Sequence, residues 1–308
     1  MFRWMRYLLA ATLISFLAAC GGDDDGPPTI TDTATSDPRL ATLAEALSAA
    51  GLAGTLAQPG NFTVFAPTND AFNRLLAELG VSKQQLFNDR TLLTAVLQYH
   101  VLNARVQRAA VPAGKAITPL AGGIFKIDAV GNGLVITDGR NRTANIVETD
   151  ILTANGVVHV VDRVILPADK NIVQTAQALP QFSILVEAVV AAGLQGALSG
   201  TGPLTVFAPT NDAFAALLTE LGVTKAQLLA DTALLTRVLT YHVVGSRVLK
   251  ADVPVGPAIG TLQGGTFTVD STLRITDARS RRAGITGTDV LTSNGVIHVI
   301  DRVILPAP

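Results

Sequence analysis

The sequence is poor in cysteine, in tryptophan and in net charge. Its 308 residues include one Cys and one Trp, and the formal net charge at pH 7 is −1. A single cysteine excludes an intramolecular disulfide. The near balance of charge gives no overall field that would attract nucleic acid, and Trp4 lies so close to the N-terminus that the folded part has no tryptophan for base stacking. We therefore expect no nucleic-acid partner.

The sequence also lacks the short motifs that mark common enzyme classes. It contains no G-x-S-x-G motif, no P-loop, no C-x-x-C pair and no G-x-G-x-x-G in a strand-to-helix context. These absences indicate a protein that is not an enzyme.

Hydrophobic residues, in contrast, are abundant. They make up 48% of the chain, whereas charged residues make up 15%. Such a composition can fill hydrophobic cores and argues against disorder for most of the length. The length itself favours about two domains.

The N-terminus is typical of a secreted lipoprotein. Arg3 and Arg6 precede an apolar run from Tyr7 to Ala19, which is too short for a span of about 20 residues but suits a signal peptide. The segment ends in Leu17-Ala18-Ala19-Cys20, which resembles the lipobox of bacterial lipoproteins. We expect residues 1–19 to be a signal peptide and Cys20 to carry the lipid; the alternative is a plain signal peptide with an incidental cysteine.

Residues 20–36 are expected to form a flexible acidic tether. The segment GGDDDGPPTITDTATS, residues 21–36, has no hydrophobic period. Gly21 follows the cysteine where inner-membrane lipoproteins tend to carry Asp. The resemblance therefore favours the outer membrane or the cell surface of a bacterial envelope.

The rest of the chain contains one unit twice. Three pairs of segments match: TVFAPTNDAF at 63–72 and 205–214, Tyr-His-Val at 99–101 and 241–243, and NGV[VI]HV[VI]DRVILPA at 155–168 and 294–307. We predict two domains, residues 37–168 and 169–308. In the first, helices are expected to begin near Asp37, Thr68, Ser82 and Asp89. Short alternating strands follow them, which indicates an α+β fold.

These three motifs, in this order and present twice, resemble the fasciclin-like domain. The resemblance covers almost everything from about residue 36 to Pro306. It implies two tandem domains, each a wedge of two β-sheets with several helices packed against it. It also implies extracellular adhesion or matrix binding, without an established cofactor.

The histidines and the Asn-Asp pairs are expected to be structural. All four histidines fall at paired repeat positions, and none has a second His or a Cys at ligand spacing, so we predict no metal site. Asn-Asp in the opening motif suits the first turn of a helix. The residues assigned to this structural group are Asn69, Asp70, Asn211, Asp212, His159 and His298.

Two groups of residues are candidates for contact with partners. The resemblance places adhesion contacts at an Asp-Ile pair before the closing motif and around the Tyr-His motif. The corresponding residues here are Asp150, Ile151, Asp289, Val290, Tyr99, His100, Tyr241 and His242. A second group, expected at hairpin tips and suited to carboxylates or sulfates, consists of Arg140, Arg142, Arg279, Arg281 and Arg282.

The leading hypothesis is a secreted, lipid-anchored adhesion module that binds an extracellular-matrix or cell-surface protein or polysaccharide through two linked domains. An alternative is a periplasmic or surface protein that binds a small ligand or an acidic glycan through the basic hairpin tips. An enzyme is the third class, and it would need a site that no motif marks.

Overall fold

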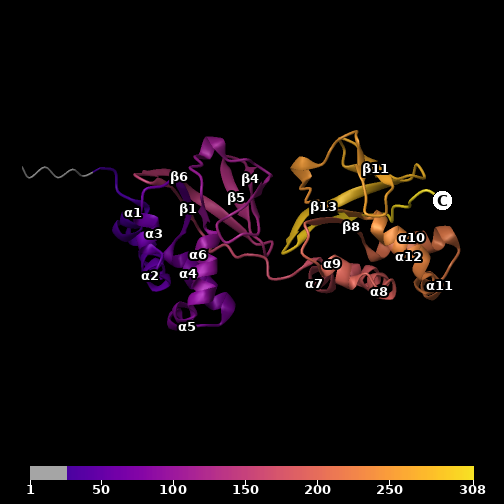
Figure 1. Ribbon diagram of the computed structural model, residues 1–308, viewed down its shortest axis with the longest axis horizontal. Helices are drawn as coiled ribbons and strands as arrows, with labels where there is room; N and C mark the ends of the chain where they lie inside the picture. The colour runs from indigo at the N-terminus through magenta and orange to yellow at the C-terminus, as the bar shows by residue number, and fades with distance from the viewer. Residues whose placement is uncertain (1–25) are drawn as a thin grey trace, which may run out of the picture.

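The computed structural model describes residues 26–308, which form two α+β domains joined by a short segment (Figure 1). The α+β class and the tandem organisation are as the sequence predicts. The signal peptide and the lipidated Cys20 lie outside the described residues. Within residues 26–308, no helix is both long enough and apolar enough to cross a bilayer.

The first domain begins with most of its helices and ends with most of its strands. Its helices are α1 (Ile30–Ser36), η1 (Pro38–Leu40), α2 (Ala41–Ala50), α3 (Ala53–Ala57), α4 (Asn69–Leu79), α5 (Lys83–Asn88), α6 (Arg90–Tyr99) and η2 (Arg108–Ala110). Its strands are β1 (Phe62–Pro67), β2 (Val101–Leu102), β3 (Ala116–Ile117), β4 (Phe125–Val130), β5 (Gly133–Thr137), β6 (Thr143–Thr153) and β7 (Gly156–Val161).

The second domain repeats this order. Its helices are α7 (Ile172–Gln177), η3 (Pro180–Phe182), α8 (Ser183–Ala191), α9 (Gln195–Ser199), α10 (Asn211–Leu221), α11 (Lys225–Ala230), α12 (Thr232–Tyr241) and η4 (Lys250–Asp252). Its strands are β8 (Leu204–Pro209), β9 (Val243–Val244), β10 (Ala258–Gly260), β11 (Thr266–Val269), β12 (Arg274–Thr276), β13 (Arg282–Thr292) and β14 (Gly295–Ile300).

The expectation of a flexible tether is wrong for residues 30–36, which form α1. Thr29 and Asp32 make a capping box, and Ile30 is buried. The Ile30 N–H donates to Oδ1 of Asn155 over 3.0 Å, so the asparagine of the closing motif holds this helix in place. The first domain therefore begins at α1 rather than at residue 37, and α7 holds the same position in the second domain.

Each domain contains one seven-stranded sheet. The strand order is β2-β1-β7-β6-β5-β4-β3 in the first domain and β10-β11-β12-β13-β14-β8-β9 in the second. The parallel pair β1 and β7 joins the opening motif to the closing motif, with Phe65 opposite His159. A Cβ at Gly156 would collide with the carbonyl oxygen of Phe62. The glycine of the closing motif therefore permits the close approach of these two strands.

A bend in β6 closes the first sheet on itself. The register of β6 against β7 shifts between Ile146 and Glu148 and again before Ile151, and such bulges bend a strand. The rings of Phe65 on β1 and Phe125 on β4 lie 5.4 Å apart although three strands separate β1 from β4 in the sheet order. The two halves of the bent sheet therefore provide the two layers of the expected wedge.

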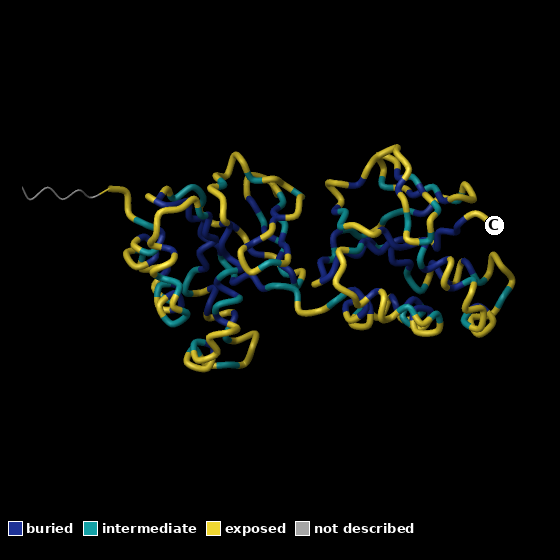
Figure 2. Tube along the Cα trace, in the orientation of Figure 1, coloured by how far each residue is buried: buried dark blue, intermediate teal, exposed yellow. Residues whose placement is uncertain are grey.

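Each domain has its own pair of hydrophobic cores. In the first domain, one core lies between the helices and the sheet and includes Leu43, Phe72 and Val158. The other fills the bend of the sheet and includes Phe65 and Phe125. The second domain repeats both. Figure 2 shows buried chain inside each domain and an exposed segment between them, which contains Asp169 and Lys170.

Candidate binding surfaces

His100 and His242 end the helices α6 and α12 and are buried, with exposures of 1% and 2%. Nδ1 of His100 donates to the carbonyl of Val96 over 2.7 Å, and Nε2 accepts the N–H of Ile165 over 3.0 Å. His242 makes the same two bonds in the second domain. Burial lowers the pKa of both imidazoles to about 4. They are therefore neutral near pH 7, and both ring nitrogens are already bonded to backbone.

The tyrosines that precede these histidines are also buried. Tyr99 and Tyr241 have no exposed surface, and their hydroxyls donate to the carbonyls of Ile124 and Thr266 over 2.5 Å. The hypothesis of partner contact through the two Tyr-His pairs, at residues 99–100 and 241–242, is therefore wrong for the folded chain. The motif instead ties the end of a helix to the sheet.

His159 and His298 stand behind the Asp-Ile and Asp-Val pairs. Nδ1 of His159 accepts the N–H of Asp150 over 3.2 Å, and Nε2 donates to the carbonyl of Val106 over 2.9 Å. His298 repeats this arrangement with Asp289. Burial lowers the pKa of both imidazoles. These rings position the backbone of the two aspartates and offer no free nitrogen for catalysis.

Asp150 and Asp289 lie at the bulge inside the long strands β6 and β13. Both have φ of 60°, a left-handed conformation that Asp tolerates better than most residues. Oδ1 of Asp150 accepts the N–H of Arg108 over 2.8 Å, and Oδ1 of Asp289 accepts the N–H of Lys250 over 2.7 Å. The two aspartates therefore have the same local geometry.

Their surroundings differ, because only Asp289 lies in the junction between the domains. Nζ of Lys126, on β4 of the first domain, lies 2.9 Å from Oδ2 of Asp289 and 3.0 Å from Oδ2 of Asp128. Burial by itself would lower the pKa of Lys126, but its bonds to the two carboxylates outweigh burial and raise it. The ammonium therefore stays charged and pairs with an aspartate of which 2% of the side chain is exposed.

Asn141 extends the junction to the backbone of β13. Its Nδ2 donates to the carbonyl of Leu291 over 3.0 Å, and its Oδ1 accepts the N–H of Leu291 over 2.6 Å. An apolar cluster packs beside this pair, with one residue from the first domain and three from the second: Ile124, Leu249, Leu291 and Val296. The junction therefore contains an ion pair, a two-point amide contact and a small core.

The equivalent strand of the first domain has no such cover. Leu152, which corresponds to Leu291 in the repeat, is 54% exposed, whereas Leu291 is 1% exposed. Asp150 is partly exposed, and within residues 26–308 no Lys or Arg lies within ion-pair distance of its carboxylate. The bulge is thus accessible in one domain and covered in the other.

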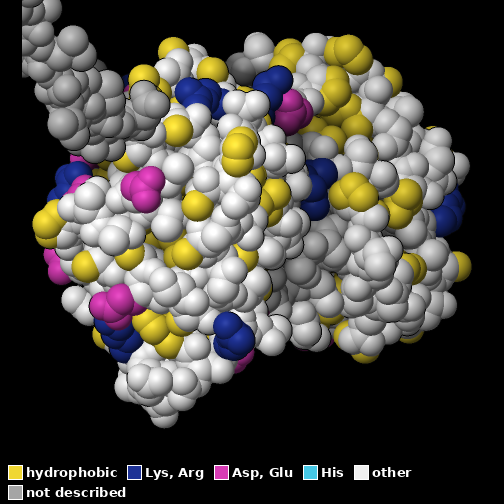
Figure 3. Space-filling model, turned by 60° about the vertical axis from the view of Figure 1, so that its left-hand side comes forward, with side chains coloured by type: hydrophobic (Ala, Val, Ile, Leu, Met, Phe, Trp, Pro, Cys, Tyr) yellow, Lys and Arg dark blue, Asp and Glu magenta, His cyan; other side chains and the backbone are white. Residues whose placement is uncertain are grey.

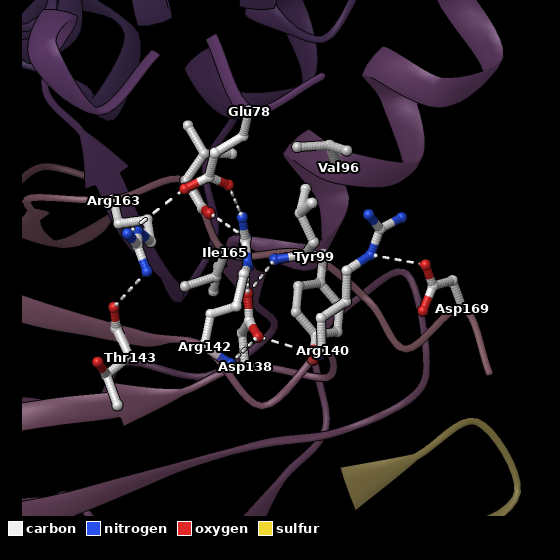
Figure 4. A network of polar contacts seen from close by, with 12 residues as sticks. Glu78, Val96, Tyr99, Asp138, Arg140, Arg142, Thr143, Arg163, Ile165 and Asp169 are labelled. Carbon is white, nitrogen blue, oxygen red and sulfur yellow. Dashed lines mark hydrogen bonds and ion pairs between the residues drawn. The ribbon is translucent and has the colours of Figure 1, made fainter. Parts of the chain in front are cut away.

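The arginines expected at exposed hairpin tips are mostly held inside the protein. Arg142 donates to the buried Asp138 over 2.7 Å, to Glu78 over 2.5 Å and to the carbonyl of Val164 over 2.7 Å (Figure 4). Arg281 makes the corresponding contacts in the second domain. These two guanidinium groups join the turn to the closing segment, so the anion-binding role predicted for them is wrong.

Arg140 and Arg279 are only partly free. Nε of Arg140 lies 3.3 Å from the carboxylate of Asp169, as Figure 4 shows. Nε of Arg279 donates to the carbonyl of Pro306 over 2.9 Å. Each guanidinium group therefore already makes one contact with the segment that follows the last strand of its domain.

Arg282 belongs to a basic hollow that the sequence analysis did not identify. Arg274 on β12 and Arg302 after β14 line the same hollow, whose volume is about 400 Å³. Because Arg274 lies opposite Gly284, Arg274 and Arg282 are diagonal neighbours on one face of the sheet. Within the described part of the chain, none of these arginines forms an ion pair with a carboxylate. Only the pairing of β12 with β13 brings them together, and sequence spacing does not show it.

The Asn-Asp pair of the opening motif divides its work. Thr68 caps α4, while Asn69 accepts the N–H of Thr42 over 2.9 Å and donates to the carbonyl of Pro38 over 2.8 Å. Asp70 is exposed in the first turn. Asn211 and Asp212 repeat this arrangement. Asn69 therefore fixes α4 to the preceding helices, whereas Asp70 only adds a negative charge to the first turn.

Residues 26–308 contain no group of three His, Cys, Asp or Glu side chains that could hold a metal ion. The molecular face in Figure 3 shows no histidine, and its apolar side chains are spread over the face, with a larger group at the upper right.

Comparison with known proteins identifies the repeat. The Fasciclin domain family matches residues 38–167 and 180–306. Transforming growth factor-beta-induced protein ig-h3 of Sus scrofa is 33% identical over 249 residues, which cover 80% of this chain and 35% of that protein. Periostin of Homo sapiens is 28% identical over 277 residues, 86% of this chain and 30% of that protein.

A bacterial relative and a solved structure match as well. Protein sll1483 of Synechocystis is 45% identical over 139 residues, 44% of this chain and 73% of that protein. A solved FAS1 domain pair from the insect cell adhesion molecule Fasciclin I covers 86% of this chain, with 92% of that structure matched, a TM-score of 0.41 and 20% identity. The chain spans about a third of the length of ig-h3 and periostin. The chain belongs to the fasciclin-domain family and carries two fasciclin domains in tandem.

Proposed function

We propose that this protein is a non-enzymatic adhesion module, secreted and held at the bacterial outer membrane or cell surface by a lipid on Cys20. Its partner would be a protein or polysaccharide of the extracellular matrix or of another cell surface. Fasciclin domains occur in adhesion proteins, and two of them make up almost all of the described chain. The Cys20 lipobox resemblance supports the anchor.

The single observation that carries the proposal is the difference between the two bulges. Asp150 and Leu152 are accessible in the first domain, while Asp289 and Leu291 are covered. We therefore assign the contact to the strand around Asp150 and Ile151. The second domain then supports the first and is not a second, equal site. This proposal replaces the hypothesis of binding through two linked domains.

A direct test is an array of matrix proteins and polysaccharides probed with the lipid-free chain that begins at Gly21. The proposal predicts binding that falls in the double variant Asp150→Asn, Leu152→Ser. Thermal unfolding of both proteins checks that the variant is folded. Absence of any binding by the wild-type chain, or equal binding by the variant, would contradict the proposal.

A second candidate function, binding of an acidic glycan, is favoured by the basic hollow of Arg274, Arg282 and Arg302. Closely spaced guanidinium groups can engage carboxylate or sulfate bidentately. The first domain has Val135 and Thr143 in place of the first two arginines, so the site would exist once per chain. Replacing the three arginines with Gln should abolish retention on a heparin column at low salt, whereas Arg142→Gln should leave retention unchanged.

A further inference from the structure

The junction between the two domains shows how one fasciclin domain covers the bulge of another. We call Ile124, Lys126 and Asn141 the donor set, because these residues of the first domain reach across the junction. We call Leu249, Asp289, Leu291 and Val296 the acceptor set. The contacts between the two sets are the ion pair of 2.9 Å, the two amide hydrogen bonds to Leu291 and the apolar cluster.

The first domain has an acceptor set of its own. The residues at the corresponding repeat positions are Gln107, Asp150, Leu152 and Val157. Asp150 has the same φ as Asp289 and the same bonds from a loop N–H and to a histidine. Leu152 is exposed where Leu291 is covered. Gln107 in place of Leu249 makes this face somewhat more polar.

The second domain, in contrast, lacks the donor set. Thr266, Thr268 and Ser280 stand at the positions of Ile124, Lys126 and Asn141. A threonine cannot neutralise the carboxylate of Asp150, and a serine cannot make the two-point contact that the amide of Asn141 makes. A second copy of this chain therefore offers a poor partner through its second domain, and its first domain is already engaged.

The N-terminal segment of the chain is also a poor partner for this face, because its acidic residues have the same charge as Asp150. The carbonyl of Pro28 accepts the N–H of Ala154, so the chain approaches this face just after the run Asp23-Asp24-Asp25. Acidic side chains of this kind would be repelled by the carboxylate of Asp150. A matching occupant would bring a cation, an amide and an aliphatic side chain, which are the groups that the donor set supplies at the junction.

We propose that the acceptor set of the first domain docks a fasciclin-type domain of another protein, one that carries Lys, Asn and an aliphatic residue at the donor positions. This inference rests on the proposed function only for the location of the contact. Its geometry comes from the junction inside the chain, where the equivalent face of the second domain already binds the first domain.

The test is to restore the donor set in the second domain of the lipid-free chain. The variant Thr266→Ile, Thr268→Lys, Ser280→Asn should bind the first domain of the next copy. Light scattering after gel filtration should then give a mass that rises with protein concentration, while the wild-type chain stays at the mass of one chain. Adding Asp150→Asn and Leu152→Ser should return the variant to that mass.

Three outcomes would overturn the inference. One is a folded donor variant that stays at the mass of one chain. If the triple variant does not fold, the single variant Thr268→Lys is measured in its place. Another is association that persists when Asp150 and Leu152 are replaced. The third is a wild-type chain that already associates and is dissociated by Asp150→Asn, which would make a second copy the occupant. None of these depends on matrix binding, so a failed array contradicts the proposed function without affecting this result.

Discussion

Lys126 of the first domain and Asp289 of the second form an ion pair of 2.9 Å across the domain junction, with 13% and 2% of their side chains exposed. The pair joins residues that are far apart in the sequence. It also covers one of the two repeated aspartates and leaves Asp150 accessible. The pair is therefore one of the contacts that make two otherwise similar domains differ, and the second domain has Thr268 in place of the lysine.

Removing that lysine should destabilise the junction. Lys126→Met leaves a buried carboxylate without its cation, which typically costs about 3–5 kcal/mol. Asp289 keeps the N–H of Lys250, so we expect the low end, about 3 kcal/mol, in urea unfolding followed by circular dichroism.

Lys115 provides the matched control for this experiment. It also pairs across the junction, with Asp252 at 3.6 Å, but both side chains are well exposed. Lys115→Met should cost no more than about 1 kcal/mol. Equal losses in the two variants would show that the Lys126 pair has no special role.

The buried histidines should make the stability depend on pH. The pKa of His100 and of His242 is about 4 in the folded chain, against 6.5 for an unperturbed imidazole. Below pH 6.5 the unfolded chain therefore binds protons that the folded chain does not. The contribution of these two histidines to stability should be constant well above that pH and fall toward pH 4, by at most about 1.4 kcal/mol per pH unit for each histidine.

Proton NMR of the imidazole rings checks this directly. The resonances of His100 and His242 should not titrate between pH 8 and pH 5. A titration midpoint near pH 6.5 for either ring would mean that the ring reaches solvent, which would contradict its burial. Urea midpoints measured across the same range should decline only in the acidic half.

Asn69 and Asp70 should differ sharply although they are neighbours. Asn69→Ala leaves the N–H of Thr42 and the carbonyl of Pro38 without their partner, which should cost about 1–3 kcal/mol. Asp70→Ala removes only a favourable charge in the first turn, worth about 0.3–1 kcal/mol. Thermal unfolding of the two variants measures both losses of stability. A larger loss in Asp70→Ala than in Asn69→Ala would contradict this account and make the carboxylate the more important group of the motif.

Local patterns in the sequence predicted much of the fold. The repeated motifs indicated both domains, and helix starts near Thr68, Ser82 and Asp89 correspond to N-caps in the structure. The start of α1 was missed although Thr29 and Asp32 have the spacing of a capping box. The acidic composition around them favours a coil, but burial of Ile30 stabilises the helix.

The sites were harder to predict because their contacts are not local. Asp138 and Arg142 lie four residues apart in the turn between β5 and β6, but Glu78 pairs with Arg142 from α4. The sequence does not show this contact, so the turn looks solvated. The resemblance assigned partner contact to the Tyr-His motif, and the sequence does not show that both rings are buried. No spacing indicated that Lys126 would meet Asp289, since that contact depends on how the two domains pack.

The most direct test of the account is the affinity of the lipid-free chain for the best partner from the array, measured by surface plasmon resonance. Asp150→Asn, Leu152→Ser should weaken binding about tenfold or more, equivalent to about 1.4 kcal/mol. Val255→Ser, which removes an exposed apolar side chain from the second domain, should leave the affinity unchanged. Equal affinities for wild type and both variants would contradict the claim that the open bulge of the first domain is the adhesive contact.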